Sequence, residues 1–341
     1  MGVFMQIFRT DDNKVSKFIH LDGSETCIKT VYSVDYKPDG NGEVDVKVTD
    51  RNKYSVFVSA SKGCPMACSF CYLTIDDVPF GKLRYDEVIN NVKAAILNEA
   101  ENNDLSSRYI KLCWMGMGEA LLTPDLVTAG TIEILEWVHN KGLAKGLDGV
   151  DISTVLPKMK DTWVDHLPEL NRALMVYDLN PNNKNVVNRE RGSLVEYSNR
   201  SRFRLFYSLH SAIQETRDVI MPNCMDIEEA IPSLWKLQDA GVDVIIHHMF
   251  LEGTNDTEEE LDALVEYMTD NFPHNELRIL RYNKHDASDV RESDVFEKCV
   301  CYIQGKIEKI KVQVSYGKDV KSACGQFIYN SGDELEKFKV E

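Results

Sequence analysis

The sequence predicts an α/β fold: a partial barrel of six βα units, preceded by a small antiparallel β extension. From residue 59 onward, short β-branched runs alternate with longer amphipathic segments, which is typical of a parallel sheet wound by crossover helices. Barrels of this kind often reach the length of 341 residues as a single domain. With 43% hydrophobic residues, the chain can bury a substantial core.

The first 58 residues differ because their apolar runs follow one another without helical segments between them. Asp22-Gly23 and the segment 38–42 separate some of these runs, and both are turn signals that join antiparallel strands. We therefore expect residues 1–58 to form the β extension, which leads into the first barrel strand. The runs cover residues 3–8, 16–21, 26–34, 44–48 and 54–58.

The barrel is expected over residues 59–330, with a C-terminal tail at 331–341. Hydrophobic periodicity distinguishes its strands from its helices. Strands are predicted at 109–114, 149–153, 203–209, 242–249, 276–281 and 311–314. Helices are predicted at 85–98, 124–139, 227–239, 257–269 and 293–304.

One segment, residues 177–202, interrupts the alternation and is expected to be an inserted polar loop. A connection of that length inside a compact domain is usually a functional loop or a disordered one. Its cations could contact phosphates of a substrate, or the loop could simply be solvated. Its basic residues include Lys184, Arg189, Arg191, Arg200 and Arg202.

Three cysteines in the order CxxxCxxC lie on one short stretch directly after a strand-like run: Cys64, Cys68 and Cys71. Thiolate sulfur is a soft ligand that suits iron–sulfur clusters and zinc. A structural zinc site would want a fourth ligand close by, and no second CxxC or His pair follows. The pattern favours an iron–sulfur cluster, with zinc or a chance group of buried thiols as alternatives.

Composition limits the partners and the compartment. Asp and Glu number 55 against 39 Lys and Arg, for a net charge of −16. Nucleic-acid binding depends largely on cations that neutralise phosphates, so this balance counts against a nonspecific polyanion binder, although a local basic stripe can coexist with it. Nine cysteines indicate metal and redox chemistry in a reducing compartment. We find no signal-peptide pattern and no apolar run that could span a bilayer, and expect a cytoplasmic protein.

The cysteine stretch resembles the signature of the radical S-adenosylmethionine (SAM) superfamily, with Phe70 as the usual aromatic before the third cysteine. Further motifs, in family order between residues 20 and 328, resemble the RlmN/Cfr family of radical SAM methyltransferases, which modify RNA adenosine at carbon 2 or carbon 8. The matching motifs lie at 114–122, 152–154, 207–210, 221–223, 251–256, 281–283 and 317–326.

The resemblance implies that the three cysteines hold a [4Fe-4S] cluster, whose open iron binds SAM, and that a flavodoxin-type protein donates electrons. It also implies SAM contacts at the ends of successive strands, where βα barrels collect their sites. We expect the two glycines of this set to let the backbone approach the methionine part of SAM, and the glutamate to accept from the SAM amino group. The matching residues are Gly116, Gly118, Glu119, Ser153, Ser208, Leu209, His210 and Asn283. Each alone could be an ordinary strand-end residue.

By the same resemblance, Cys324 is the methyl-carrying cysteine. In the family, one SAM methylates this thiol, and a radical generated from a second SAM abstracts hydrogen from the S-methyl group. The resulting carbon radical adds to the adenine ring. The alternative is a buried small thiol, which is the commonest fate of free cysteine. Such core or surface positions are expected for Cys113, Cys224, Cys299 and Cys301.

The chain departs from the family at four places. Phe57 stands where the family has the thiol that assists product release, and Lys29 stands where it has a glutamate proposed as the base. The accessory RNA-binding domain is expected to be absent, and the turn at 153–157 lacks its glycine. Lysine can act as a base only after losing its proton, which burial favours. Cys27, on the same strand face as Lys29, could replace the missing thiol or could simply pack.

Three functions remain as alternatives. The first is a radical SAM methyltransferase that transfers a one-carbon unit to an sp2 carbon of a nucleic-acid base, with RNA adenosine implied by the resemblance. The second is a radical SAM enzyme that acts on a peptide or a small metabolite, which the acidic charge and Phe57 favour. The third is an iron–sulfur protein that binds SAM without turnover.

Overall fold

The structure is a computed structural model of the chain. It describes residues 4–30, 33–38, 44–50, 52–158, 163–177, 188–190, 193–195 and 203–313. The predicted methyl carrier Cys324 and most of the predicted loop 177–202 lie outside these residues.

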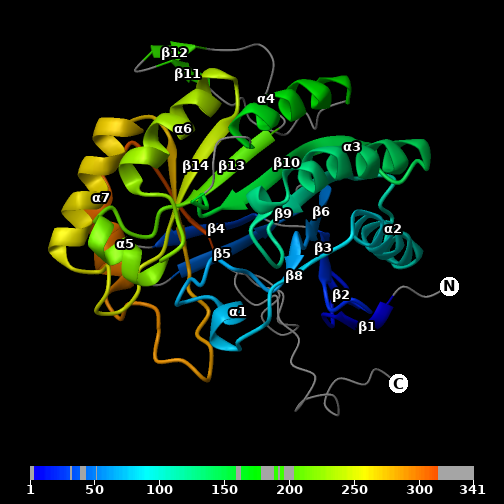
Figure 1. The fold of residues 1–341 in the computed structure, drawn as a ribbon, viewed down its shortest axis with the longest axis horizontal. Coiled ribbons are helices and arrows are strands. Elements are labelled where there is room, and N and C mark those ends of the chain that lie inside the picture. The colour runs from blue at the N-terminus through cyan, green and yellow to red at the C-terminus, as the bar shows by residue number, and fades with distance from the viewer. Residues whose placement is uncertain are drawn as a thin grey trace.

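Strands of the described chain form a ten-stranded central sheet that changes from antiparallel to parallel along its width (Figure 1). The antiparallel part is β1 (Phe4–Arg9), β2 (Val15–His20) and β3 (Glu25–Thr30), and β3 pairs with the first barrel strand, β6 (Lys53–Val58). The predicted fold, a β extension followed by a partial parallel barrel, is confirmed. The parallel strands continue with β9 (Tyr109–Trp114), β10 (Gly146–Thr154), β13 (Phe203–Ser208), β14 (Asp243–His248), β15 (Glu276–Leu280) and β16 (Lys309–Gln313).

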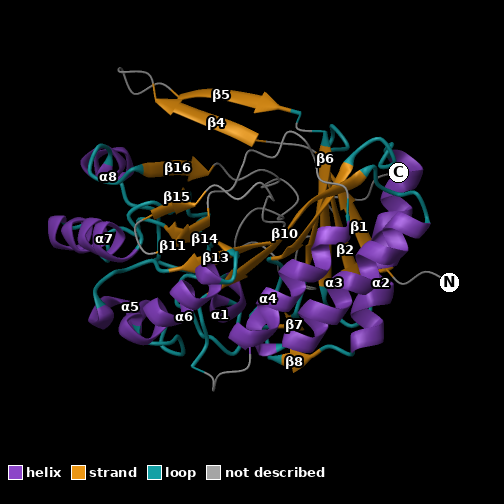
Figure 2. Cartoon of the chain, turned by 90° about the horizontal axis from the view of Figure 1, so that it is seen from above, coloured by secondary structure: helices purple, strands orange, loops and turns teal. Residues whose placement is uncertain are grey.

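Helices lie along the outer side of the curved sheet, so the opposite face of the strands forms the barrel interior (Figure 2). Among the described helices, none is long and apolar enough to cross a membrane. Helices α1, α4 and α5 were not predicted; α4 contains Pro168, and α1 and α5 are too short to show a clear period. The helices are α1 (Tyr72–Ile75), α2 (Tyr85–Asn102), α3 (Pro124–Asn140), α4 (Trp163–Ala173), α5 (Gln214–Ile220), α6 (Ile227–Asp239), α7 (Glu258–Asn271) and α8 (Phe296–Ile303).

In the described part of the chain, three two-stranded sheets lie outside the main sheet. The run predicted as one strand at 26–34 is divided, because β3 ends at Thr30 and β4 (Ser33–Pro38) pairs instead with β5 (Val44–Thr49). Figure 2 shows this hairpin on the side of the sheet that the helices leave uncovered. The others are β7 (Ser61–Lys62) with β8 (Gly81–Lys82), and β11 (Asn188–Glu190) with β12 (Ser193–Val195), the latter inside the predicted loop.

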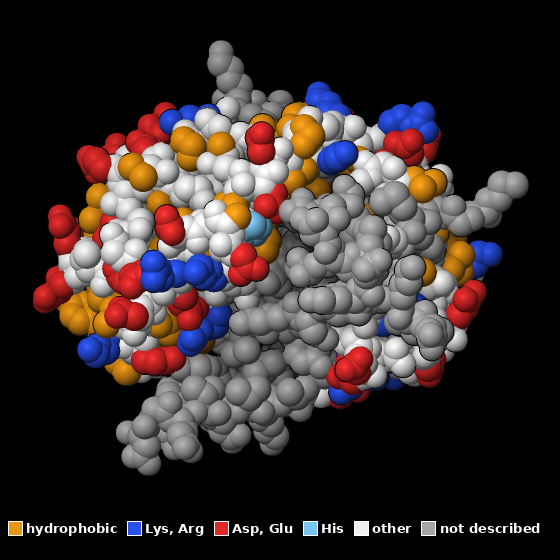
Figure 3. Space-filling model, turned by 90° about the horizontal axis from the view of Figure 1, so that it is seen from below, with side chains coloured by type: hydrophobic (Ala, Val, Ile, Leu, Met, Phe, Trp, Pro, Cys, Tyr) orange, Lys and Arg blue, Asp and Glu red, His pale blue; other side chains and the backbone are white. Residues whose placement is uncertain are grey.

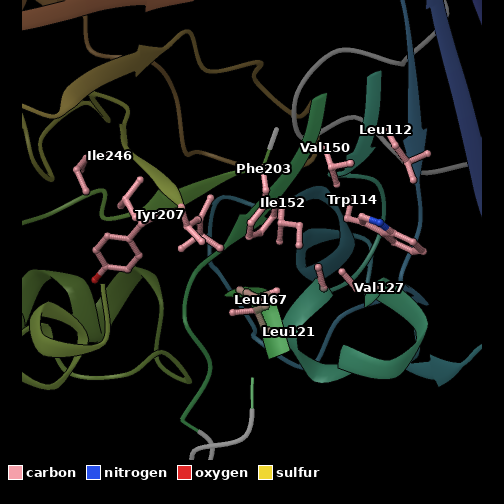
Figure 4. Packing of buried hydrophobic residues seen from close by; sticks show 14 of the residues in the cluster. Leu112, Trp114, Leu121, Val127, Val150, Ile152, Leu167, Phe203, Tyr207 and Ile246 are labelled. Atoms are coloured by element: carbon pink, nitrogen blue, oxygen red, sulfur yellow. The ribbon is translucent and has the colours of Figure 1, made fainter. Parts of the chain in front are cut away.

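Alternate side chains of the parallel strands point outward into one large apolar core beneath the helices. Trp114 and Ile152 are buried there with Val127 of α3 and Leu167 of α4 (Figure 4). The Trp114 indole nitrogen donates to the Thr131 hydroxyl at 2.8 Å, so this buried polar group is satisfied. Because successive side chains of a strand point to opposite faces, the residues between these apolar ones point into the barrel.

The inner face carries charged side chains among apolar ones such as Phe206, whose ring centroid lies 6.0 Å from the Arg204 guanidinium. Asp151 accepts from Arg204 Nε at 2.7 Å and is paired with Lys111 on the neighbouring strand. Burial alone would raise the pKa of Asp151, but these two cations outweigh it and lower the pKa to about 2. A further buried pair joins Lys53 and Asp148 at 2.8 Å. These ion pairs join side chains of different strands inside the barrel.

Candidate active site

The cysteine loop lies between β7 and α1, at the carboxyl end of β6. Cys71 forms the N-cap of α1, and its backbone N–H donates to the Cys68 carbonyl at 3.0 Å. Gly63 opens the loop with φ +59, and a Cβ there would lie 2.6 Å from the Val78 carbonyl oxygen. The backbone therefore makes a tight turn that presents three thiols within eight residues, Cys64 to Cys71.

The three thiols lie in apolar surroundings. Cys64 and Cys71 pack against both a buried group that includes Met117 and one that includes Met221. Burial raises the pKa of Cys64 to about 12 and also raises that of Cys71. Thiolates in such a place need a compensating cation, and a bound metal supplies one.

This donor set fits an iron–sulfur cluster better than a single ion. Three thiols on one loop suit a cluster, in which each cysteine binds a different iron. A structural zinc ion would need four ligands around one centre. Cys64, Cys68 and Cys71 would hold the cluster.

The loop after β9 brings Gly116 and Gly118 against the residues that precede the cysteine loop. A Cβ on Gly116 would lie 2.8 Å from backbone atoms of Val58 and Ser59, and one on Gly118 (φ +89) would lie 2.9 Å from the Ser61 nitrogen. The close approach that these glycines permit in this structure is therefore to the chain itself. Their predicted contact with SAM stays a prediction.

Glu119 ends the same loop and is 4% exposed. One carboxylate oxygen accepts from Leu121 N at 3.0 Å, and the other accepts from Val155 N at 3.0 Å. Burial raises its pKa. The carboxylate thus ties the loop after β9 to the turn after β10, at the level of the cysteine loop.

The later strands converge on the cysteine loop through aromatic contacts. The ring of His210, after β13, lies 5.1 Å from that of Phe70. Burial lowers the pKa of His210 well below its usual range, so the imidazole is neutral. After β15, Tyr282 donates its hydroxyl to the Phe70 carbonyl at 3.1 Å. Asn283, which follows Tyr282, is 5% exposed.

The ends of β10 and β13 are joined by Arg217, a residue that the sequence did not single out. It is fully buried, and its guanidinium donates to the Leu209 carbonyl at 3.1 Å and to the Val155 carbonyl at 3.0 Å. In the sequence, a single arginine on a short helix resembles a surface residue. No local pattern therefore indicates that Arg217 is buried or that it joins two strand ends. Ser208 and Leu209 are buried at this junction, and Ser153 is half-buried.

The residues that depart from the family pattern lie together beside the loop. Phe57 of β6 is paired in register with Cys27 of β3, and Lys29 Nζ lies 5.0 Å from the centroid of the Phe57 ring. Cys27 is fully buried in the same apolar group that Cys64 and Cys71 contact. The predicted Cys27, Lys29 and cluster cysteines are therefore neighbours in space.

A partial parallel barrel with a three-cysteine loop at its carboxyl end is the arrangement that the resemblance to radical SAM enzymes predicts. In fold, the chain resembles a radical SAM methyltransferase from Sphaerobacter thermophilus, with a TM-score of 0.63 and 20% identity, over 95% of this chain and 80% of that one. Comparison with models of known protein families finds no match.

Curated relatives narrow this class. The chain is 26% identical over 301 residues to the probable dual-specificity RNA methyltransferase RlmN of Flavobacterium johnsoniae, covering 84% of this chain and 72% of the relative. It is 26% identical over 300 residues to the dual-specificity RNA methyltransferase RlmN of Geobacter sulfurreducens, covering 84% and 68%. The chain is a distant homologue of the RlmN-type radical SAM methyltransferases, and it is an enzyme of the class that transfers methyl groups. The resemblance noted in the sequence is confirmed.

Proposed function

We propose that this enzyme methylates an sp2 carbon of a nucleic-acid base in RNA, using a [4Fe-4S] cluster and SAM. The observation that supports it is that the loops after β13 and β15 meet the cysteine loop at one end of the barrel, through His210 and Tyr282, which both contact Phe70. Two relatives whose alignments cover 84–85% of this chain are probable RNA methyltransferases by name.

In this proposal the cluster and SAM together supply a carbon radical able to abstract hydrogen. Cys64, Cys68 and Cys71 hold the cluster. Glu119, neutral His210 and Asn283 bind SAM. The other proposed SAM contacts are Gly116, Gly118, Ser153, Ser208 and Leu209. The apolar lining around the thiols excludes water, which protects a reactive intermediate from side reactions.

Cys324 carries the methyl group to the substrate, and Lys29 and Cys27 take part in releasing the product. The positions of Cys27 and Phe57 support that assignment, because both belong to the apolar group that Cys64 and Cys71 contact. Lys29 adjoins this group through the Phe57 ring. A flavodoxin-type protein in the cytoplasm supplies the electron.

A second candidate acceptor is a peptide or a small metabolite. The net charge of −16 favours it. On the face shown in Figure 3, the described Lys and Arg side chains lie interspersed with Asp and Glu and do not gather in one basic patch. RNA binding would require such a patch for its phosphates.

Two measurements test the proposal. Mass spectrometry of digested cellular RNA, with and without the gene, should reveal a methylated nucleoside that disappears in the deletion strain and returns with the wild-type gene but not with Cys324→Ala. Peptide mapping of the purified protein should find one additional methyl group on Cys324. An unchanged RNA profile together with SAM cleavage in vitro would favour the second candidate, and an unmodified thiol in active protein would contradict the carrier role.

A further inference from the structure

Cys224 lies beside the cysteine loop, although the sequence predicts an ordinary core or surface thiol there. It follows α5, is 2% exposed, and packs in the buried group that contains Met66 and Met221. It shares this buried group with Cys68, and its proximity helps to raise the pKa of the Cys68 thiol. A fourth cysteine therefore lies beside one of the three that would hold the cluster.

Hydrogen bonds on both sides hold Cys224 in this place. Ser69 N donates to the Ile220 carbonyl at 2.9 Å, and the side-chain amide of Asn223 donates to the Pro65 carbonyl at 2.8 Å. On the other side, Met225 N donates to the Leu156 carbonyl at 2.7 Å. The segment 220–225 thus bridges the cysteine loop and the turn after β10.

The chemistry of the proposed site decides which of these two neighbouring side chains, Cys68 and Cys224, could donate a hydrogen bond to the other. A cysteine bound to iron is a thiolate, which has no proton and can only accept. The proton must then come from Cys224. We propose that the Cys224 thiol donates a hydrogen bond to the sulfur of Cys68 and thereby raises the reduction potential of the cluster.

This inference rests on the cluster of the proposed function, but not on its substrate. Hydrogen bonds to ligand sulfurs are among the factors that set the potential of iron–sulfur clusters. A donor stabilises the reduced form more, because reduction adds negative charge that the sulfur shares. Cys224 therefore makes the cluster easier to reduce by an external one-electron donor.

The test is a potentiometric titration of the anaerobically reconstituted protein, followed by the electron paramagnetic resonance signal of the reduced cluster. In Cys224→Ala, we expect the ratio of reduced to oxidised cluster at a given potential to fall about tenfold, which is 59 mV for a one-electron couple. Cys224→Ser should stay close to wild type, because its hydroxyl can donate. Cys299→Ala removes a buried thiol on α8 from a different apolar group and should leave the potential unchanged.

If Cys224→Ala does not fold, Cys224→Val fills the space without a donor and gives the same comparison. A wild-type potential in the donor-free variant would overturn the proposal. So would loss of iron from both Cys224→Ala and Cys224→Ser, since Cys224 would then be a ligand. A wild-type protein that binds no iron would overturn the proposed function as well, whereas bound iron with an unshifted potential overturns this inference alone.

Discussion

Lys29 Nζ lies 5.0 Å from the centroid of the Phe57 ring, on two paired strands next to the cysteine loop. By the family resemblance, these positions would carry a glutamate and a cysteine. A cation over an aromatic ring contributes about 0.5–1 kcal/mol to stability, but the ring can neither take a proton nor attack sulfur. In the proposed reaction, release of a product bonded to Cys324 therefore needs other groups.

Replacing Cys27 with Ala should convert turnover into a trapped covalent complex of protein and substrate. Cys27 is the thiol paired with Phe57 and packed against the same group as Cys64 and Cys71. Intact-protein mass spectrometry after incubation with SAM, reductant and RNA measures the adduct, with Cys299→Ala as the matched thiol control. Normal turnover without an adduct would exclude Cys27 from product release.

Changing Cys64, Cys68 and Cys71 together to Ala should abolish iron binding and SAM cleavage. These thiols lie on one turn in apolar surroundings and would be the ligands of three irons. Iron content and 5′-deoxyadenosine formation after anaerobic reconstitution give the readout. Cys113→Ala, at a buried thiol of β9, should retain wild-type iron; unaltered iron in the triple variant would contradict the assignment of the cluster site.

Gly116→Ala should lower the free energy of unfolding by about 1–3 kcal/mol, the usual cost of overpacking. The new Cβ would lie 2.8 Å from backbone atoms of Val58 and Ser59, which cannot rotate away as a side chain can. Denaturant unfolding measures the change. Gly81→Ala is the control, because its nearest neighbour would be 3.9 Å away. Equal stability of the two variants would show that the loop after β9 can shift without cost.

His248→Phe should reduce the sensitivity of stability to acid. His248 is 1% exposed, its ring nitrogens have no hydrogen-bond partner among the described residues, and burial lowers its pKa to about 3. The unfolded chain binds a proton near pH 6.5 that the folded chain does not, so this contribution to stability is present above pH 6.5 and is lost as the pH falls toward 3.

The expected loss between pH 7 and pH 5 is about 2 kcal/mol from this histidine. Urea titrations of both proteins at the two pH values measure it. Because His210 and His247 are also buried with lowered pKa values, some acid sensitivity should remain in the variant. An identical pH dependence in wild type and His248→Phe would contradict the lowered pKa assigned to His248.

The sequence by itself determined the alternation of strands and helices, because each element repeats its apolar residues with a period that only its own few neighbours define. It also determined the cysteine loop, since three ligands within eight residues need no distant partner. The boundaries of α6 (Ile227–Asp239) and β9 (Tyr109–Trp114) coincide with the predicted ranges for this reason.

Tertiary structure alone decided which distant residues meet. Cys224 shares a buried group with Cys68, and Arg217 joins the ends of β10 and β13. Gly116 has no room for a Cβ, because the backbone at the end of β6 approaches it closely. None of these relationships leaves a local pattern, because each arises only when the parallel strands have paired and brought their carboxyl ends to one edge. The run at 26–34 shows the same limit: its period predicts a strand, but pairing divided it between two sheets.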